Sequence, residues 1–489
     1  MRSILNNIEI LIRTGESNKA RRVLSNYRSS SLTRTDRHDL AALARRAGLP
    51  LMTLRLLTPI VRPPAKQPMK ASERERAEYA AALVRVGATT EAIEMLQGID
   101  PSKTPQVHLY FAHALFTRWE YEAAVPFLEK YVDHAPDTYQ RIIGKMNLAS
   151  ALVHERKISS AQAVLHDLED ETKREKLRAL HGNTLERLAE LAIDRGQWRE
   201  AERYLTRAEA DVDAAGGFDE FFVRKWRYIS DLLQKKSHSA QRLLTLRTEA
   251  IQREHWETVR ECDAYLARAT NNVPLFHRVY FGTPYPSYRK RLLVDFGLST
   301  RLPDSFDWCF EGELPPTRIL DFLREPVVKA HPTIKLGQVK HRLLRVLTSD
   351  FYRPFRVANL FSEIYAGECF HIESSPARVH QGVKELKKWF LRHRIPLRLT
   401  EKSGGYRLVA RGARIAITVP TPEWWERHAL GGIERVRHSA GTRPFSTEDV
   451  VRWLRISRRS AANWLRLAIE KDRITKIGAG PQTRYCLKS

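Results

Sequence analysis

The stretch GQWREAERYL, residues 196–205, places a glycine, an alanine and a leucine at the spacing of a turn followed by a helix. The same order recurs six more times in the first half of the chain: a turn residue, four residues, a small residue, three residues and a leucine. The recurrences are GESNKARRVL at 15–24, GLPLMTLRLL at 48–57, GATTEAIEML at 87–96, WEYEAAVPFL at 119–128, RKISSAQAVL at 156–165 and KKSHSAQRLL at 235–244. A repeat of this period predicts a stack of similar units.

Another amphipathic pattern precedes each recurrence, for example Val107 to Phe116 or Leu185 to Ile193. Each unit is therefore predicted to be two helices joined by a tight turn. One such pair cannot bury its own apolar face, so the pairs must stack into a solenoid. The small residue is expected where the second helix crosses the first. These crossing positions are Ala20, Thr53, Ala92, Ala124, Ala161, Ala201 and Ala240.

This pattern resembles tetratricopeptide repeats over roughly residues 1–270, with GQWREAERYL and WEYEAAVPFL as the best matches. The resemblance implies a scaffold that binds a peptide or a protein surface. An array that serves only as a spacer or for dimerisation has the same pattern, so both alternatives stay open.

Positive charge is concentrated in the second part of the 489-residue chain, whose net charge is +25. Residues 1–270 hold 43 Lys and Arg against 37 Asp and Glu, whereas residues 271–489 hold 39 against 20. This imbalance predicts a polyanionic partner for the second part. Nucleic acid is favoured over a membrane surface, because no apolar run is long enough to span a bilayer and MRSILNNIEI lacks the apolar core of a signal peptide.

The four cysteines are far apart and form no C-x-x-C pair, which favours a reducing, cytoplasmic location over a disulfide or zinc framework. Cys369 and His371 are close in sequence, but two candidate ligands do not make a metal site. We expect Cys369 to be a buried thiol, and no metal or cofactor is predicted.

Residues 271–335 are rich in Pro, Gly and aromatics, with poor periodicity and short candidate strands such as 306–310. This segment is predicted to connect the solenoid to the basic C-terminal part of the chain. It mixes aromatic and cationic side chains, which suit either a nucleic-acid contact or a solvated linker. The residues are Tyr285, Tyr288, Arg289, Lys290 and Arg291.

Residues 336–411 contain two amphipathic helix patterns, then a third that is capped at Ser374 or Ser375, and then a hairpin. The first pattern turns Val339, Leu343, Leu344 and Leu347 inward, the second Val357, Leu360, Phe361 and Ile364, and the third Val379, Val383, Leu386 and Phe390. Gly404 and Gly405 allow the tight turn of the hairpin. Three helices and a basic hairpin predict a winged helix-turn-helix, whose third helix enters the major groove.

This unit resembles the effector domain of OmpR/PhoB-type response regulators, which is shared with transcriptional activators such as the SARP family. The matching features are LRVL, PFRVANLFSEIYAGE, RVHQGVKELKKWF and the terminal GYRL. The resemblance implies DNA contacts by Arg378, Gln381, Lys384 and Lys388 on the helix, and by Lys402 and Arg407 on the hairpin. No phospho-acceptor receiver domain precedes the unit, so a protein or peptide partner on the repeats is the expected source of control.

A second unit of this kind is predicted over residues 421–489. A helix is expected to begin at Thr421, Ser446 and Asp449 form a candidate capping pair, and Ser457 caps the next helix. That helix turns Ala461, Leu465, Ala468 and Ile469 inward, and Gly478 and Gly480 lie at the tip of a second hairpin. The unit resembles generic bacterial winged helices of the MarR or ArsR kind. The predicted DNA-binding residues are Arg459, Asn463, Arg466, Lys476 and Arg484.

Enzyme motifs are missing from the sequence: it has no phosphate-binding G-x-x-x-x-G-K-[ST], no G-x-S-x-G, no H-E-x-x-H and no dinucleotide fingerprint. The sequence thus predicts a mainly α protein, a helical-repeat solenoid followed by two winged helices with small β-wings, and no enzyme. We expect a cytoplasmic, bacterial-type transcription regulator that binds double-stranded DNA. The alternative is a repeat scaffold for protein assembly whose nucleic-acid binding is incidental or directed to RNA, and dimerisation is left open.

Overall fold

The computed structural model describes residues 2–488 except 28–31, 64–69, 216–219, 297–301, 311–315, 322, 324–333, 335–337, 412–413, 422–432, 455, 471, 479 and 481–482. The chain divides into two compact units. The first unit comprises Met1–Ser299, Ser349–Gly382 and Thr400–Arg407, and the second comprises Thr300–Thr348, Val383–Leu399 and Leu408–Ser489.

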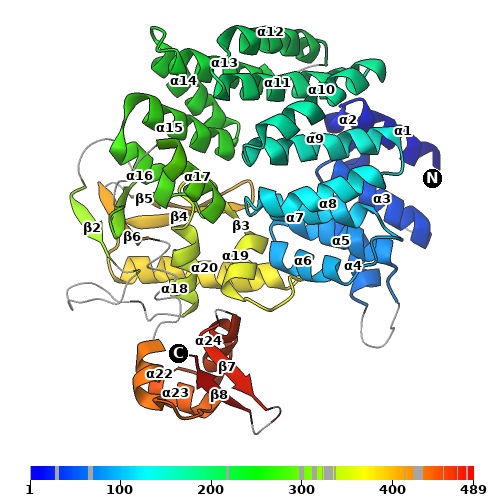
Figure 1. Cartoon of the computed structure of the whole chain (residues 1–489). Helices are drawn as coiled ribbons and strands as arrows, with labels where there is room; N and C mark the ends of the chain where they lie inside the picture. Colours follow the sequence, from blue (N-terminus) through cyan, green and yellow to red (C-terminus); the bar gives the residue numbers. More distant parts are fainter. Residues whose placement is uncertain are drawn as a thin grey trace. The chain divides into compact units, whose positions relative to one another are not determined.

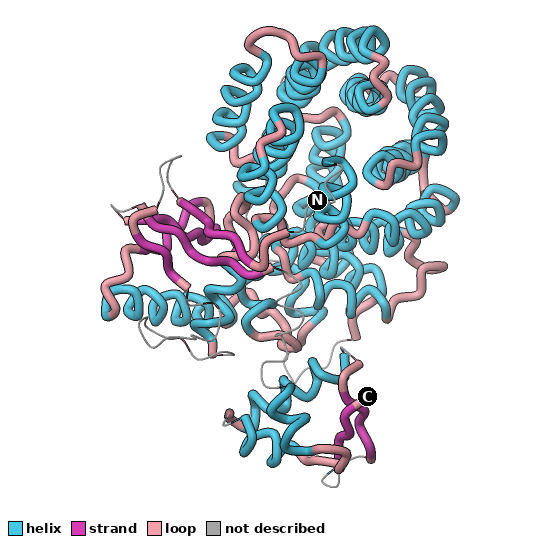
Figure 2. Tube along the Cα trace, turned by 60° about the vertical axis from the view of Figure 1, so that its left-hand side comes forward, coloured by secondary structure: helices cyan, strands magenta, loops and turns pink. Residues whose placement is uncertain are grey.

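The predicted helix pairs form the bulk of the first unit (Figure 1). The pairs are α1 (Arg2–Arg13) with α2 (Ser17–Asn26), α3 (Arg34–Arg46) with α4 (Pro50–Val61), α5 (Glu73–Val86) with α6 (Thr89–Gln97), α7 (Gln106–Phe116) with α8 (Tyr121–Asp133), α9 (Thr138–His154) with α10 (Ile158–Arg174), α11 (Arg178–Asp194) with α12 (Trp198–Ala215), and α13 (Glu220–Leu233) with α14 (Ser239–Gln252). Their helices follow one another along a curve (Figure 2).

The turn inside each pair uses a left-handed residue, and that residue is the first of each ten-residue pattern. Four of these residues are glycines, which adopt positive φ without steric cost. The other three are non-glycine residues held at φ 54–60°. The seven turn residues are Gly15, Gly48, Gly87, Trp119, Arg156, Gly196 and Lys235.

Six of the seven predicted crossing positions are fully buried, at 0% exposure, from Ala20 to Ala201. Ala240 is the exception, since it is only half-buried and Ser239 takes the crossing position instead. The leucine four positions further on shifts in the same way: Leu243 is buried, whereas Leu244 is 43% exposed. The register differs here because α14 begins only at Ser239, after a second left-handed residue at His238.

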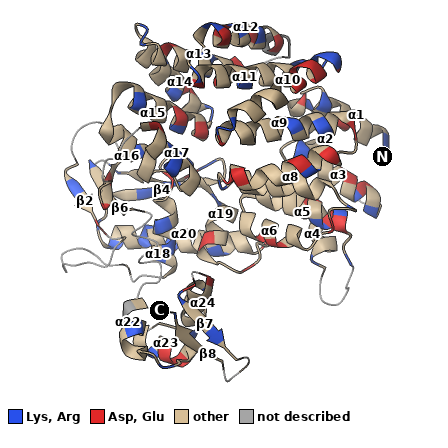
Figure 3. Cartoon of the chain, viewed as in Figure 1, with Lys and Arg blue, Asp and Glu red and all other residues tan. Residues whose placement is uncertain are grey.

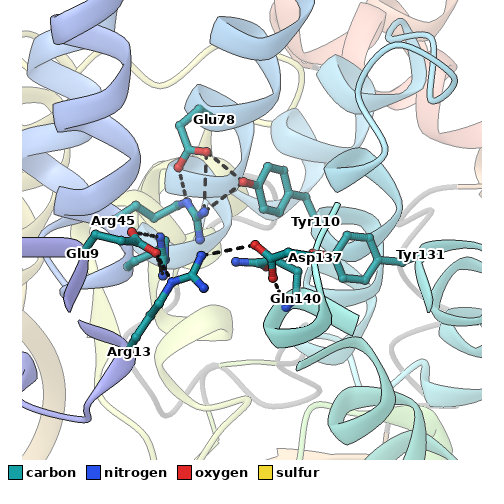
Figure 4. A network of polar contacts seen from close by, with 9 residues as sticks. Glu9, Arg13, Arg45, Glu78, Tyr110, Tyr131, Asp137 and Gln140 are labelled. Carbon is teal, nitrogen blue, oxygen red and sulfur yellow. Dashed lines mark hydrogen bonds and ion pairs between the residues drawn. The ribbon is translucent and has the colours of Figure 1, made fainter. Parts of the chain in front are cut away.

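The first helices of successive pairs contact one another and form the inner layer of the array. A polar network joins them at the N-terminal end (Figure 4). Arg45 of α3 pairs with the buried Glu78 of α5, and both bond the hydroxyl of Tyr110 on α7, at 2.9 and 2.8 Å. Arg13 of α1 reaches Asp137, which caps α9, at 3.2 Å. Buried charges persist where they are paired and hydrogen-bonded, so this network fixes the stacking of several repeats.

The helical array continues with α15 (Trp256–Thr270) and then, inside the predicted connecting segment, with α16 (Val273–Phe281) and α17 (Pro286–Phe296). Tyr285 and Tyr288, considered above as nucleic-acid or solvated residues, are instead buried at 6% and 8% exposure. Their rings contact Trp119, with centroids 5.8 and 4.4 Å away. A stripe of aromatic and apolar residues at helical spacing explains this burial, because α17 packs against the array.

Residues 339–410 follow the predicted order of three helices and a hairpin, with one additional short strand. The elements are α18 (Val339–Leu347), β3 (Phe355–Arg356), α19 (Val357–Ile364), α20 (Ser375–Arg392), β4 (Leu397–Lys402) and β5 (Gly405–Ala410), and the sheet has the order β3-β5-β4. The predicted apolar stripes are buried apart from Val339 and Val357, which are half-buried because each is the first residue of its helix. Leu336 lies outside the described residues.

A second sheet has the order β1-β6-β2; its first strand confirms the candidate strand at 306–310, whereas the sheet itself was not predicted. It joins β1 (Ser305–Cys309) antiparallel and β2 (Arg318–Leu320) parallel to β6 (Ile415–Pro420). The central strand β6 is buried at every position. Strands that precede and follow the predicted DNA-binding segment thus pair with each other.

The C-terminal module contains α22 (Ile433–Ala440), α23 (Thr447–Leu454), α24 (Arg458–Glu470), β7 (Ile474–Ile477) and β8 (Arg484–Leu487). Most of the helix predicted to begin at Thr421 falls outside the described residues. Ile469, predicted inward, is 38% exposed, and Trp464 lies in the core instead. A step of three from Ala461 selects Trp464, so the buried face of α24 is rotated toward that side.

Candidate nucleic-acid interface

Helix α20 separates an apolar face from a cationic face. Val379, Val383, Leu386 and Phe390 are at most 3% exposed, whereas Gln381, Lys384, Lys387 and Lys388 are exposed. Lys388 pairs with Glu385 at 3.2 Å, and Lys384 forms no ion pair within the part of the chain that the structure describes. Lys and Arg mark this helix in Figure 3. The face can offer amide and ammonium groups to base edges.

Arg378, in the first turn of the same helix, is directed toward Glu368 and Tyr365 in the segment between α19 and α20. Its guanidinium bonds Glu368 at 2.5 and 3.3 Å and lies 3.9 Å from the centroid of the Tyr365 ring. The hydrogen bond to Glu368 raises the pKa of Arg378. A phosphate or base would have to compete with this carboxylate.

The β4–β5 hairpin turns at Ser403 and Gly404, both with positive φ, at 51° and 72°. Two left-handed residues in this position form the tight turn that matches strand twist. Gly405 serves a different purpose from the predicted one: a Cβ there would lie 2.8 Å from Cβ of Pro354. Gly404 therefore makes the turn, and Gly405 permits close packing.

The hairpin tip lies against the turn between α14 and α15. Lys402 Nζ is 3.3 Å from Glu254, and Ser403 Oγ donates to the same carboxylate at 3.0 Å. The guanidinium of Arg407 lies over the ring of Trp256, 5.7 Å from its centroid. Burial and the nearby Arg278 lower the pKa of Arg407. Both predicted phosphate-contacting residues of the hairpin are thus engaged by the repeats.

Helix α19 and the loop after it dock on α4, α5 and α6. Asn359 Nδ2 donates to the carbonyl of Gly87 at 3.0 Å, and the Asn359 side chain fills the space that a Cβ on Gly87 would need. The amide of Phe370 donates to Glu91 at 2.7 Å, and Arg62 donates to the Phe370 carbonyl at 2.6 Å. Arg62 and Glu91 also pair with each other. Helix α19 and the loop after it therefore pack closely against the repeats through specific hydrogen bonds.

A buried ion pair anchors the segment before β3. Arg260 of α15 donates to both oxygens of Asp350 at 2.8 and 2.9 Å, and both side chains are fully buried. Tyr352 adds a hydrogen bond to Asp263 at 3.0 Å. Burial opposes the charge of Arg260, but the Asp350 carboxylate outweighs it, so the pKa of Arg260 is raised.

The C-terminal module places its predicted residues on exposed positions. Ser446 and Asp449 form the expected reciprocal cap of α23, at 2.9 and 3.2 Å, and Ser457 accepts from the amide of Ser460 at 3.2 Å. Gly478 and Gly480 have positive φ at the hairpin tip, as predicted. Arg466 pairs with Glu470 at 2.5 Å. The exposed predicted residues are Arg459, Asn463, Arg466, Lys476 and Arg484.

The contacts between the hairpin, α19 and the repeats are functional features that the sequence analysis missed. Glu254, Trp256, Asn359 and Gly87 carry them, and each pair is separated by about 150 residues or more. A local pattern cannot reveal such pairs. Only Gly87 hinted at such a contact in the sequence, because a glycine without a Cβ leaves room for another side chain, here that of Asn359, to pack against it.

The described residues meet neither the requirements of a metal site nor those of a membrane-spanning helix. They contain no group of three or more His, Cys, Asp and Glu placed to hold a metal ion. Cys369, predicted to be a buried thiol, is exposed in the loop between α19 and α20. Among the described helices, none has the length and apolar character needed to cross a bilayer.

No protein-family model matches the sequence, and no curated protein matches it either. Among solved structures, the chain is similar to a Rap protein complexed with competence and sporulation factor, at 11% identity and a TM-score of 0.42, over 60% of this chain and 88% of that one. It is also similar to aspartyl phosphate phosphatase F from Bacillus subtilis, at 14% identity and a TM-score of 0.29, over 60% of this chain and 82% of that one.

Proposed function

We propose that this chain is a sequence-specific DNA-binding transcription regulator whose helical repeats dock a protein or peptide partner. The observation that carries the proposal is α20, which buries one full apolar stripe and exposes Gln381, Lys384 and Lys388 on the other side. A helix of this kind, followed by a basic hairpin, fits the major groove as the recognition helix of a winged helix-turn-helix.

The charge of the C-terminal part supports a duplex partner. Residues 337–489 carry 30 Lys and Arg against 13 Asp and Glu. Cations position a protein on phosphates, whereas base-edge contacts give it sequence preference. In this proposal Lys384 and Gln381 read bases, and Lys402, Arg407 and the residues of the C-terminal module meet phosphates or further bases.

The partner role of the repeats rests on the turns inside two of the pairs, at Trp119 and Arg156, which already bind one helix of the same chain. Tyr285, directly before α17, and Tyr288 of α17 pack on Trp119, and Asp295 of α17 pairs with Arg156. A surface that holds an amphipathic helix through rings and ion pairs is suited to a peptide or protein segment. We propose no catalytic role and a cytoplasmic location.

A gel-shift competition tests the proposal. A duplex selected by the chain from random sequences is competed with random duplex and with RNA of the same length. We expect the selected duplex to bind most tightly, and Lys384→Ala to weaken that binding far more than Lys130→Ala, which removes the same charge from an exposed position on α8. Equal binding of RNA and both duplexes would instead favour the scaffold alternative.

A further inference from the structure

Building on the proposed function, we infer that the helical repeats hold the β4–β5 hairpin and α19 in a closed state that weakens DNA binding. The cations expected to meet phosphate are already bound by the repeats. Lys402 and Ser403 share the Glu254 carboxylate, and Arg407 covers Trp256. The hairpin cannot keep these contacts and grip a DNA backbone at the same time.

Glu254 takes the place of a phosphate in this arrangement. An ammonium group and a hydroxyl converge on its carboxylate, and these are two donor types that proteins use on phosphate oxygens. The residue lies in the turn between α14 and α15, and its carboxylate contacts the hairpin there. The acidic group therefore competes directly with DNA.

A second contact, between α19 and the turn that joins α5 to α6, fixes the position of α19 on the repeats. Asn359 fills the space beside Gly87, and Arg356 Nη1 donates to the carbonyl of Arg85 at 3.0 Å. Arg356 is the residue that precedes α19, so the N-terminus of that helix faces the α5–α6 turn. The hairpin and α19 are thus held by two separated parts of the array, and a change in its curvature would strain both contacts.

The contact between the hairpin and Glu254 is exposed to solvent, so it can break without unfolding the repeats. The Lys402 side chain is 75% exposed and that of Glu254 is 35% exposed, so solvent screens their attraction. By contrast, the anchor between Arg260 and Asp350 is fully buried and keeps the segment tethered. Breaking the contact with Glu254 therefore frees the hairpin while the chain remains attached through Asp350.

The test compares the full chain with a double variant, Glu254→Gln with Asn359→Trp, on the selected duplex. The first change removes the phosphate mimic, and the second overfills the space beside Gly87. The matched control is Glu202→Gln, which removes one negative charge from an exposed residue of α12. Trypsin cleavage after Lys402, measured without DNA, reports release of the hairpin independently of any DNA binding.

We expect the double variant to bind about tenfold more tightly, and the control to stay within about twofold. The slope of log affinity against log salt should become steeper by roughly 2, because Lys402 and Arg407 would add two phosphate contacts of about 0.9 each. Cleavage after Lys402 should be faster. If the double variant does not fold, Glu254→Gln alone should give a smaller gain and a slope steeper by about one.

Faster cleavage with unchanged affinity and slope would show that the held hairpin does not weaken DNA binding, which would overturn the inference but leave the proposed function intact. Unchanged cleavage together with unchanged affinity would show that these contacts do not hold the hairpin, and would also reject the inference. If neither protein binds duplex DNA at low salt, the proposed function itself fails, whatever the cleavage shows.

Discussion

The two basic hairpins of this chain share their local construction but differ in what surrounds them. The β4–β5 hairpin is held by the repeats through Glu254 and Trp256. The β7–β8 hairpin makes its contacts within its own module, where Tyr485 pairs with Phe445 and Lys488 pairs with Asp472. The first hairpin can therefore respond to the state of the repeats, whereas the second depends on a separate local core.

The comparison extends to how each module is stabilised. The first module, residues 339–410 with the β4–β5 hairpin, is tied to the array by a fully buried ion pair, Arg260 with Asp350. The second rests on helix caps at Ser446 and Ser457 and on an apolar cluster around Phe445 and Trp464. Changing one of these supports at a time should therefore separate the behaviour of the two modules.

The largest effect is expected from Asp350→Ala, which leaves Arg260 buried without its partner. Removing one member of a buried pair costs about 3–5 kcal/mol. Asp472→Ala, which breaks an exposed pair in the C-terminal module, should change stability by less than about 0.5 kcal/mol. Urea unfolding followed by tryptophan fluorescence measures both. Similar losses for the two variants would mean that the first module is not anchored through Asp350.

Replacing the candidate base-reading residues distinguishes the roles of the two helices. Lys384→Ala should cost about 1–3 kcal/mol on a selected duplex and less on random DNA. Asn463→Ala on α24 should do the same if the C-terminal module also reads sequence. Titration by fluorescence anisotropy gives both values. An equal loss on both duplexes would remove Lys384 from sequence readout.

Acidification should weaken the repeats before the C-terminal module. Burial, together with Arg85 and Arg45, lowers the pKa of His113 on α7 to about 3. A folded-state pKa below the unfolded value means that stability is present above about pH 6.5 and is lost as the pH falls toward 3. Asp449, whose pKa is lowered by its bond from the Ser446 amide, should lose its contribution only below about pH 4.

The measurement is thermal unfolding at pH 7 and pH 5, with His113→Gln as the diagnostic variant. Its pH-dependent loss should be smaller than that of the native chain by about 1–2 kcal/mol, since one pKa unit corresponds to about 1.4 kcal/mol. Asp194, whose pKa is raised to about 6 by burial, works in the opposite sense, so the native curve alone is not diagnostic. An unchanged dependence in the variant would contradict the assignment to His113.

Smaller losses than those of Asp350→Ala and Lys384→Ala are expected from the caps of the C-terminal module. Ser446→Ala and Ser457→Ala each remove an acceptor for a first-turn amide, which costs about 1 kcal/mol. Hydrogen exchange should rise in α23 and α24 and stay unchanged in α20. Increased exchange in α20 as well would show that the two modules unfold together.

Much of the repeat fold was predictable because its determinants are local. The turn residues Gly15 to Lys235 and the crossing positions Ala20 to Ala201 follow from spacing alone. The prediction failed at Ala240, where a second left-handed residue, His238, delays the start of α14 to Ser239, and the buried crossing position moves one residue earlier, to Ser239. A repeat pattern cannot predict a shift of the crossing position by a single residue.

The candidate interface was predictable only as a set of exposed residues. The stripe from Val379 to Phe390 fixed which face of α20 is outward, and Ser446 and Ser457 fixed two helix starts. The contacts of Lys402 with Glu254 could not be foreseen, because tertiary packing brings together residues that share no periodicity. The same reason applies to Tyr285, whose burial depends on Trp119.

The most direct test of the account is lysine footprinting of the full chain with and without a selected duplex. Acetylation of each lysine is measured by mass spectrometry, so the whole surface is compared in one experiment. We predict that Lys384 and Lys388 become protected by DNA, while Lys130 on the repeats reacts as before. Protection of repeat lysines with unchanged reactivity at Lys384 and Lys388 would contradict the assignment of α20 as the recognition helix.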